Sequence, residues 1–302
     1  MGSAGPSHEV ARGTIPAHVN PAGGRARAAL EALEGHPGFD VRLTPPDKLT
    51  VALRHAVSSG QPRVLVAGGD GTIASAAAVL AHTSTALAVL PAGTLNHFAR
   101  DHGIPTDLDE ALRVAERGRV SRVDVGYIND QLFLNTSSVG AYVRFVETRD
   151  RLEGHVGYWV ASVVAGLRLL GRLRQMRVTL EVEGEERVYR ARLVLVAVGE
   201  RVLLPPRLGR PAGERGEALH VVVPRGRRQA RRFARVFART DRGLWVAPRP
   251  LGLDTALVDR LRLDLPLPAV KVAMDGEIRR QRTPLEYRLE RGVLNLVVPA
   301  GE

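Results

Sequence analysis

The 302-residue sequence contains no cysteine, so it has no disulfide framework, no thiolate nucleophile and no cysteine-ligated metal. It also lacks a long apolar run. The best candidate, residues 156–170, is interrupted by Arg168 and is shorter than the roughly 18–20 residues of a spanning helix. The first residues show no secretory signal, and Pro6 breaks the myristoylation pattern. These absences lead us to expect a cytoplasmic protein.

Lysine is scarce, since Lys48 and Lys271 are the only two among 43 basic residues. The net charge of +11 suits phosphates, nucleic acid or an acidic membrane surface. An arginine bias beside abundant Ala, Gly and Pro also follows from genomic base composition. Charge alone therefore identifies no partner.

The hydrophobic pattern of the chain changes near residue 125. Before it, short apolar runs alternate with Ala- and Leu-rich segments, which predicts βαβ units and a doubly wound, mostly parallel α/β sheet. The uninterrupted apolar run Val64-Leu65-Val66 suits a sheet that is covered on both faces. We expect strands at 14–19, 41–43, 63–67 and 86–90, and helices at 25–33, 49–58, 72–82 and 109–117.

After residue 125 the pattern alternates with period two, which predicts an antiparallel β-rich domain. The expected strands are 177–182, 187–198, 218–223, 260–265, 270–274, 285–289 and 293–298, with helices at 157–172 and 227–239. The predicted organisation is a nucleotide-binding domain at 1–125 and a β-rich, lipid-substrate domain at 126–302, whose last strand is free to return to the first domain.

The strongest local feature is Gly68-Gly69-Asp70-Gly71-Thr72, placed between a strand and a helix of small residues. Glycines permit positive φ and let a phosphate approach backbone N–H groups, and the helix N-terminus favours its charge. The alternative is a tight βα turn with no ligand. A Walker loop is excluded because neither lysine is nearby, and residues 82–93 lack the acid of a dinucleotide fingerprint. Asp70 would repel a bare phosphate, but it suits a metal ion or a hydroxyl that must lose its proton.

This loop resembles one shared by diacylglycerol, sphingosine and NAD kinases and phosphofructokinases. The stretch from Leu90 to Pro105, with its P-x-G-T-x-N-x-F-A-R element, narrows the resemblance to the lipid-kinase branch. Further similar elements are Asn20-Pro21-Ala22-Gly23-Gly24, Val123-Asp124-Val125-Gly126, Phe133 to Gly140 and Met274-Asp275-Gly276-Glu277. Five motifs in the family's order are far more specific than any one of them.

The resemblance implies an ATP-dependent lipid kinase of the diacylglycerol-kinase type, with Mg²⁺, a role in phospholipid biosynthesis and a nucleotide cleft between the two domains. Phosphoryl transfer needs positioning, charge neutralisation and one carboxylate that receives a proton. By resemblance, Asp275 and Glu277 are candidates for the general base, with Asp70 in support. The implied ATP-site residues are Asn20, Pro21, Gly24, Thr44, Gly68, Gly69, Asp70, Gly71, Thr72, Gly93, Thr94 and Asn96.

The sequence departs from the family pattern in three places. His97 stands where Asp is usual, and the family's Gly-Asn appears as Gly199-Glu200. Its middle Asp-Gly-x-Leu motif appears as Arg215-Gly216-Glu217-Ala218-Leu219, which leaves Glu217 as the candidate metal ligand.

Other roles remain open for several of these residues. Asp275-Gly276 between alternating strands also predicts a two-residue hairpin turn. Thr94 and Asn96 are candidate caps for a helix that begins at His97. The arginine-bearing segments 157–176 and 225–239 suit either a membrane surface or packing on a sheet, the second through the stripe Arg227, Arg228, Arg231 and Arg235.

The expected partner is a lipid substrate, met by peripheral contact with a membrane surface. No nucleic-acid partner is expected, and a homodimer is left open. Two competing functions are a kinase of a soluble substrate such as NAD and a degenerate nucleotide-binding protein without turnover.

Overall fold

The structure is a computed structural model that describes residues 14–140, 143, 175–182, 184–200, 218–224 and 253–300. Its first half alternates strands and helices: β1 (Ile15–Val19), α1 (Ala26–Glu34), β2 (Phe39–Leu43), α2 (Pro46–Ser58), β3 (Arg63–Gly68), α3 (Asp70–Leu80), β4 (Ala86–Pro91), α4 (His97–Asp101) and α5 (Leu108–Arg117). These bounds confirm the predicted helices and strands of this half to within a few residues.

The second half consists of strands. They are β5 (Arg119–Ile128), β6 (Gln131–Phe133), β7 (Thr136–Gly140), β8 (Met176–Val182), β9 (Glu185–Ala191), β10 (Leu193–Val198), β11 (Leu219–Pro224), β12 (Leu253–Val258), β13 (Arg260–Asp264), β14 (Ala269–Met274), β15 (Glu277–Arg282) and β16 (Leu285–Val298). The helices expected at 157–172 and 227–239 lie outside the described residues.

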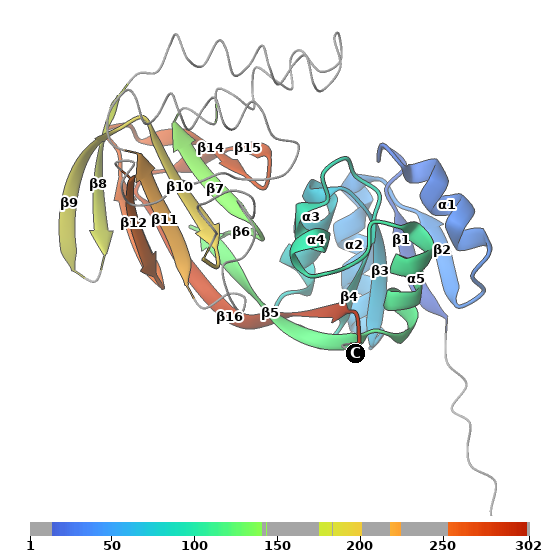
Figure 1. Cartoon of the computed structure of the whole chain (residues 1–302). Coiled ribbons are helices and arrows are strands. Elements are labelled where there is room, and N and C mark those ends of the chain that lie inside the picture. The colour runs from blue at the N-terminus through green and yellow to red at the C-terminus, as the bar shows by residue number, and fades with distance from the viewer. Residues whose placement is uncertain are drawn as a thin grey trace, which may run out of the picture.

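The α/β half is built on parallel strands in the order β2-β1-β3-β4. Helices lie on both sides of this sheet (Figure 1). Residues 64–68 of β3 are buried, as expected for a strand covered on both faces. The predicted fold class, a mostly parallel α/β sheet followed by an antiparallel β-rich part, is confirmed.

β16 joins the two halves into one ten-stranded sheet (Figure 1). It pairs with β13 and β5 in antiparallel fashion and, near its end, with β4 in parallel through Leu296 and Leu87. The two strands expected at 285–289 and 293–298 are therefore one strand, with a register shift between Glu290 and Leu294. Gly292 in this irregular stretch has a φ of +59°.

The end of α3 is fastened to the same strand. The backbone N–H of His82 donates to the carbonyl of Val293 at 2.8 Å, and its Nε2 lies 2.8 Å from Glu290 Oε2. The helix whose first residues form the glycine loop is thus held at its far end by β16.

The second sheet is antiparallel, in the order β12-β11-β10-β7-β14-β15. The single strand expected at 187–198 is wrong, because the chain changes sheets at Arg192. β9 pairs with β8 in the ten-stranded sheet, whereas β10 pairs with β7 and β11 in the six-stranded sheet. One apolar core fills the space between the two sheets, and a separate core lies in the α/β half.

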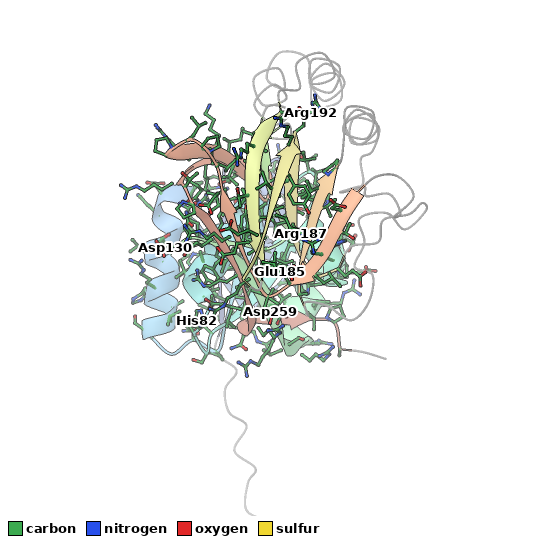
Figure 2. All side chains as sticks on the ribbon, turned by 90° about the vertical axis from the view of Figure 1, so that its left-hand side faces the viewer. His82, Asp130, Glu185, Arg187, Arg192 and Asp259 are labelled. Atoms are coloured by element: carbon green, nitrogen blue, oxygen red, sulfur yellow. The ribbon has the colours of Figure 1, made fainter. Side chains whose placement is uncertain are left out.

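Charged side chains cover the surface at the β9 end of the ten-stranded sheet, where Glu185 and Arg187 form an ion pair of 3.5 Å (Figure 2). Within the described residues, no helix has both the length and the apolarity needed to cross a bilayer.

Candidate active site

The glycine loop connects β3 to α3. Gly69 has φ −87° and ψ −179°, and neither Gly68 nor Gly71 has a positive φ. The expectation that these glycines serve a left-handed backbone is therefore wrong. Close packing requires them instead: a Cβ on Gly68 would lie 2.6 Å from Thr72 Cβ, and one on Gly69 would lie 3.3 Å from the Cα of Gly93.

The second loop, which carries the predicted residues Gly93, Thr94 and Asn96, packs directly on the first. A Cβ on Gly93 would overlap the Cα of Gly69, and the N–H of Ala92 donates to the carbonyl of Gly68 at 3.0 Å. Thr94 is exposed at the surface. Backbone thus lies against backbone at this point, which leaves no room for a side chain on Gly93 and only a tight fit for one on Gly69.

The turn after β1 completes this edge of the sheet. Asn20 donates its backbone N–H to Ala67 at 3.0 Å, and its side-chain Nδ2 donates to Thr72 Oγ1 at 2.9 Å. Its Oδ1 accepts the N–H of Ala22 at 3.0 Å, which fixes the turn that contains Pro21 and Gly24. The turn and the glycine loop therefore meet at the carboxyl ends of parallel strands, where open α/β sheets bind ligands.

Thr44 directly follows β2 at the same edge but is buried, at 7% exposure. Its backbone N–H donates to the carbonyl of Val19 at 2.9 Å, and its hydroxyl lies 2.9 Å from His18 Nδ1. Burial, and secondarily the charge of Arg42, lowers the pKa of His18, so the imidazole stays neutral beside the hydroxyl. Both the hydroxyl and the backbone N–H of Thr44 are thus used in hydrogen bonds to β1.

Asp70 connects the two loops. Its Oδ1 accepts the backbone N–H of Phe98, in the first turn of α4, at 3.1 Å. Asn96 precedes this helix with φ +50° but does not cap it with its side chain; its amide instead bonds both the N–H and the carbonyl of Gly93, at 2.9 and 2.8 Å. The helix does begin at His97 as predicted, and its side-chain cap comes from Asp70, not from Thr94 or Asn96.

Asp275 and Gly276 form the turn between β14 and β15. Their φ values are +46° and +90°, and Met274 pairs with Glu277 across the turn. Positive φ at both central residues is what the tight hairpin turn favoured by Asp-Gly requires. The hairpin expected from Asp275-Gly276 is confirmed.

The Asp275 carboxylate does more than complete a turn. It accepts three backbone N–H groups, those of Leu134 at 2.7 Å, Asn135 at 2.8 Å and Thr136 at 3.0 Å. The residue as a whole stays partly exposed, but its carboxyl group is enclosed by protein. Burial, assisted by the negative charge of Asp70, outweighs these hydrogen bonds and raises the pKa of Asp275 to about 6.

Glu277 follows the turn and reaches the glycine loop. Its Oε1 lies so close to the Gly71 backbone that a Cβ on Gly71 would overlap it. Its Oε2 accepts a hydrogen bond from Arg279 Nη2 at 3.1 Å, and the two side chains are 51% and 41% exposed. A carboxylate from the end of the chain thus lies at the first turn of α3.

The structure therefore brings together the loop residues, Asp70, Asp275 and Glu277, whose assignment as site residues stays a prediction. Glu217 lies outside the described residues. Sequence reasoning missed Arg279, although alternation along a strand would have placed it on the same face as Glu277. It also missed the three N–H donors around Asp275, which no side-chain pattern announces.

These loops and sheets define a two-part α/β fold of the kind found in diacylglycerol kinase and NADH kinase structures. A putative diacylglycerol kinase from Bacillus anthracis str. Sterne superposes with a TM-score of 0.73 at 20% identity, covering 94% of this chain and 96% of that one. Yeast NADH kinase gives a TM-score of 0.51 at 12% identity, covering 95% of this chain and 84% of that one.

Residues 19–128 match the diacylglycerol kinase catalytic domain family, which confirms for this segment the resemblance indicated by the motifs. A probable lipid kinase, YegS-like, from Cronobacter sakazakii is 33% identical over 55% of this chain and 56% of its own length. A diacylglycerol kinase from Staphylococcus carnosus is 29% identical over 50% of this chain and 49% of its own. The chain thus spans about half the length of the curated relatives that it matches.

Proposed function

We propose that this chain is an ATP-dependent lipid kinase that transfers the γ-phosphoryl group to a lipid hydroxyl such as that of diacylglycerol. One observation carries the proposal: the Glu277 carboxylate lies against Gly71, at the start of the helix that follows the glycine loop. A phosphate cradle and a proton acceptor are the two parts that phosphoryl transfer to an alcohol needs. The family match over residues 19–128 supports the choice of a lipid kinase.

Glu277 is the better candidate for the general base, because the oxygens of Asp275 already accept three backbone N–H groups. In the proposed step, Glu277 takes the proton of the lipid hydroxyl, the alkoxide oxygen attacks the γ-phosphorus, and ADP leaves with the electron pair of the broken P–O bond. Asp275 then acts as a positioning residue that fastens the hairpin to residues 134–136.

Magnesium fits the proposed site through the carboxylate of Asp70. In proteins this ion is commonly held by one or two carboxylates together with phosphate oxygens and water. No group of three His, Asp or Glu side chains in the described part of the chain is arranged to hold a metal by itself. Asp70 uses Oδ1 for Phe98, so its other oxygen is the donor that suits a phosphate-bound ion, and Glu277 stays available as the proton acceptor. When bound, magnesium would neutralise charge on the phosphate oxygens.

The lipid would be met at a membrane surface by a peripheral cytoplasmic protein. The arginine stripe proposed for this contact lies outside the described residues, and the possible homodimer stays a prediction. Surface arginines near an anionic leaflet contribute about 1 kcal/mol each, screened by salt.

The test is a radiolabelled-ATP assay with two acceptors, diacylglycerol in mixed vesicles and NAD, and with vesicles that lack diacylglycerol as the blank. We expect label in the lipid, and its loss in Glu277→Gln, which keeps the shape of the side chain but cannot take a proton. Labelled NAD would favour a kinase of a soluble substrate. ATP binding without turnover on any lipid would favour a nucleotide-binding protein and overturn the proposal.

A further inference from the structure

β15 carries three polar side chains on one face. Glu277, Arg279 and Gln281 alternate along the strand, and their cross-strand partners in β14 belong to, or pack against, the apolar core between the sheets. Gln281 is 6% exposed, and its Nε2 donates to Gln131 Oε1 of β6 at 2.7 Å. Arg279 therefore lies between a buried anchor and the carboxylate at the glycine loop.

The ion pair holds Arg279 at the site without using up its guanidinium group. Its Nη2 donates to Glu277 Oε2 at 3.1 Å. A guanidinium group has five N–H donors, so several are left for a second anion. Because the Arg279 side chain is 41% exposed, a solvent-borne ligand can reach it.

A phosphate at this loop would gain from a cationic side chain in addition to the magnesium ion. Residues 64–99, which include both glycine loops, contain neither lysine nor arginine. The N-terminus of α3 contributes only about half a positive charge. Asp70 and Glu277 both add negative charge at the first turn of that helix. Arg279 is paired to one of these carboxylates, which places its positive charge beside the loop.

We propose that Arg279 is a phosphate-binding residue of this site, whose guanidinium group contacts the terminal phosphate of a bound nucleoside triphosphate. The proposal rests on the proposed function in one respect, that the glycine loop binds the triphosphate, and it does not depend on the lipid. The planar fork of arginine matches phosphate oxygens better than the point charge of lysine does. Because the contact is to the terminal phosphate, it distinguishes ATP from ADP.

The experiment compares ATP and ADP binding by isothermal titration, with magnesium present, in wild type, Arg279→Ala, Arg279→Lys and Arg280→Ala. Arg280 is a matched control because it is the next residue of β15, is exposed, and faces the opposite side beside Lys271. Arg279→Ala should weaken ATP binding roughly 10- to 100-fold and change ADP binding less than about twofold, as expected for a lost charge-assisted hydrogen bond. Arg279→Lys should lose less, and Arg280→Ala should match wild type.

Two further readouts separate this role from a purely structural one. In Arg279→Ala, added guanidinium ion should restore part of the ATP affinity, with no such effect in Arg280→Ala. The KM for ATP should rise in the same variant. The thermal unfolding midpoint should stay near that of wild type, since half-exposed ion pairs contribute little to stability. If Arg279→Ala does not fold, Arg279→Lys and Arg279→Gln carry the comparison.

Three outcomes would overturn the proposal. Equal losses of ATP and ADP affinity would show that Arg279 only shapes the loop. A lower kcat with unchanged affinity for both nucleotides would show that it acts only through Glu277. Wild type that binds neither nucleotide would overturn the proposed function as well. Discrimination of ATP from ADP by Arg279 without lipid turnover would support this inference and overturn the kinase assignment alone.

Discussion

At the scale of single residues, close packing explains the glycines of the site. Gly68 faces Thr72, Gly93 faces the backbone of Gly69, and Gly71 faces Glu277, and at none of the four is φ positive. A Cβ on Gly68 or Gly93 would overlap a neighbouring atom, one on Gly69 would make a tight contact, and one on Gly71 would meet the end of the Glu277 side chain. The neighbouring atoms differ in how easily they move. The backbone beside Gly93 cannot shift, whereas the end of the Glu277 side chain beside Gly71 can.

This difference makes Gly71→Ala an informative change. Alanine favours a helix by up to about 1 kcal/mol over glycine, so the fold should be unharmed or slightly stabilised. The new methyl group must displace the Glu277 carboxylate. We expect turnover of diacylglycerol to fall about tenfold or more, because small misplacements of a catalytic group are costly. Initial rates and thermal unfolding measure the two effects.

The control for this change is Gly35→Ala, at the end of α1, where φ is −79° and the nearest atom to a new Cβ is 3.7 Å away. It should leave turnover unchanged. Wild-type turnover in Gly71→Ala would mean that Glu277 does not act from the position seen beside the loop.

Asp70 can be tested for two separate roles. Asp70→Asn keeps an oxygen for the N–H of Phe98, so it should fold with near wild-type stability. Phosphoryl transfer should nevertheless fall at least ~100-fold if the charge supports a metal or proton transfer. Asp70→Ala also removes the cap of α4 and should cost about 1 kcal/mol of unfolding free energy in addition. Turnover of Asp70→Asn within about a factor of two would remove Asp70 from the mechanism.

At the scale of elements, the β14–β15 hairpin of the antiparallel half reaches the glycine loop of the α/β half through Glu277. Its turn is anchored by the Asp275 carboxylate on three consecutive backbone N–H groups, residues 134–136. Glu277 directly follows the turn and reaches Gly71. The position of the proposed base thus depends on how firmly this turn is held.

The raised pKa of Asp275 predicts how stability depends on pH. The pKa of Asp275 is about 6 in the folded chain, against an ordinary value of 3.8 in the unfolded chain. The folded chain therefore binds the carboxyl proton of Asp275 more tightly than the unfolded chain does. The contribution of this proton to the free energy of unfolding is fully present below the unfolded pKa and is lost as pH rises through the folded pKa. The pKa shift corresponds to a loss of about 3 kcal/mol in the free energy of unfolding as pH rises from ~4 to ~6.5.

Denaturant unfolding of wild type and Asp275→Asn across this range isolates the effect, because asparagine does not titrate. Wild type should lose stability relative to the variant as pH rises. A difference between the two proteins that does not change with pH would show that this carboxyl group has an ordinary pKa in the folded chain.

At the scale of the whole molecule, β16 makes the two halves depend on each other. Leu296 is 0% exposed and lies in the core of the α/β half, beside Leu87 of β4. We expect Leu296→Ala to lower the unfolding free energy by about 2–5 kcal/mol, as for other buried leucines. Chemical denaturation followed by circular dichroism measures it.

The matched change is Val188→Ala on β9, where the side chain is 58% exposed and the expected loss is at most about 0.5 kcal/mol. A loss of less than about 1 kcal/mol for Leu296→Ala would mean that β16 contributes little to the first core.

Local pattern predicted most elements of the α/β half, because buried strands and amphipathic helices differ in length and period. The prediction failed where pairing between strands far apart in the sequence, and not the local pattern, sets the structure. Nothing near Arg192 announces that the chain leaves one sheet for the other there. Likewise, the hydrophobic pattern around Gly292 predicts two strands. The structure has one strand there, because the neighbouring strand β5 pairs with both parts.

By itself, the sequence determined the fold class, the strand–glycine–helix order around Asp70, the hairpin at Asp275-Gly276 and the resemblance to lipid kinases. Each depends on residues that are neighbours in the chain. Only the tertiary structure decided that Glu277 lies on Gly71, that Asp70 caps α4 and that Asp275 faces the backbone of residues 134–136. These contacts join segments far apart in the chain, and their geometry follows from how the sheets pair, which no local pattern encodes.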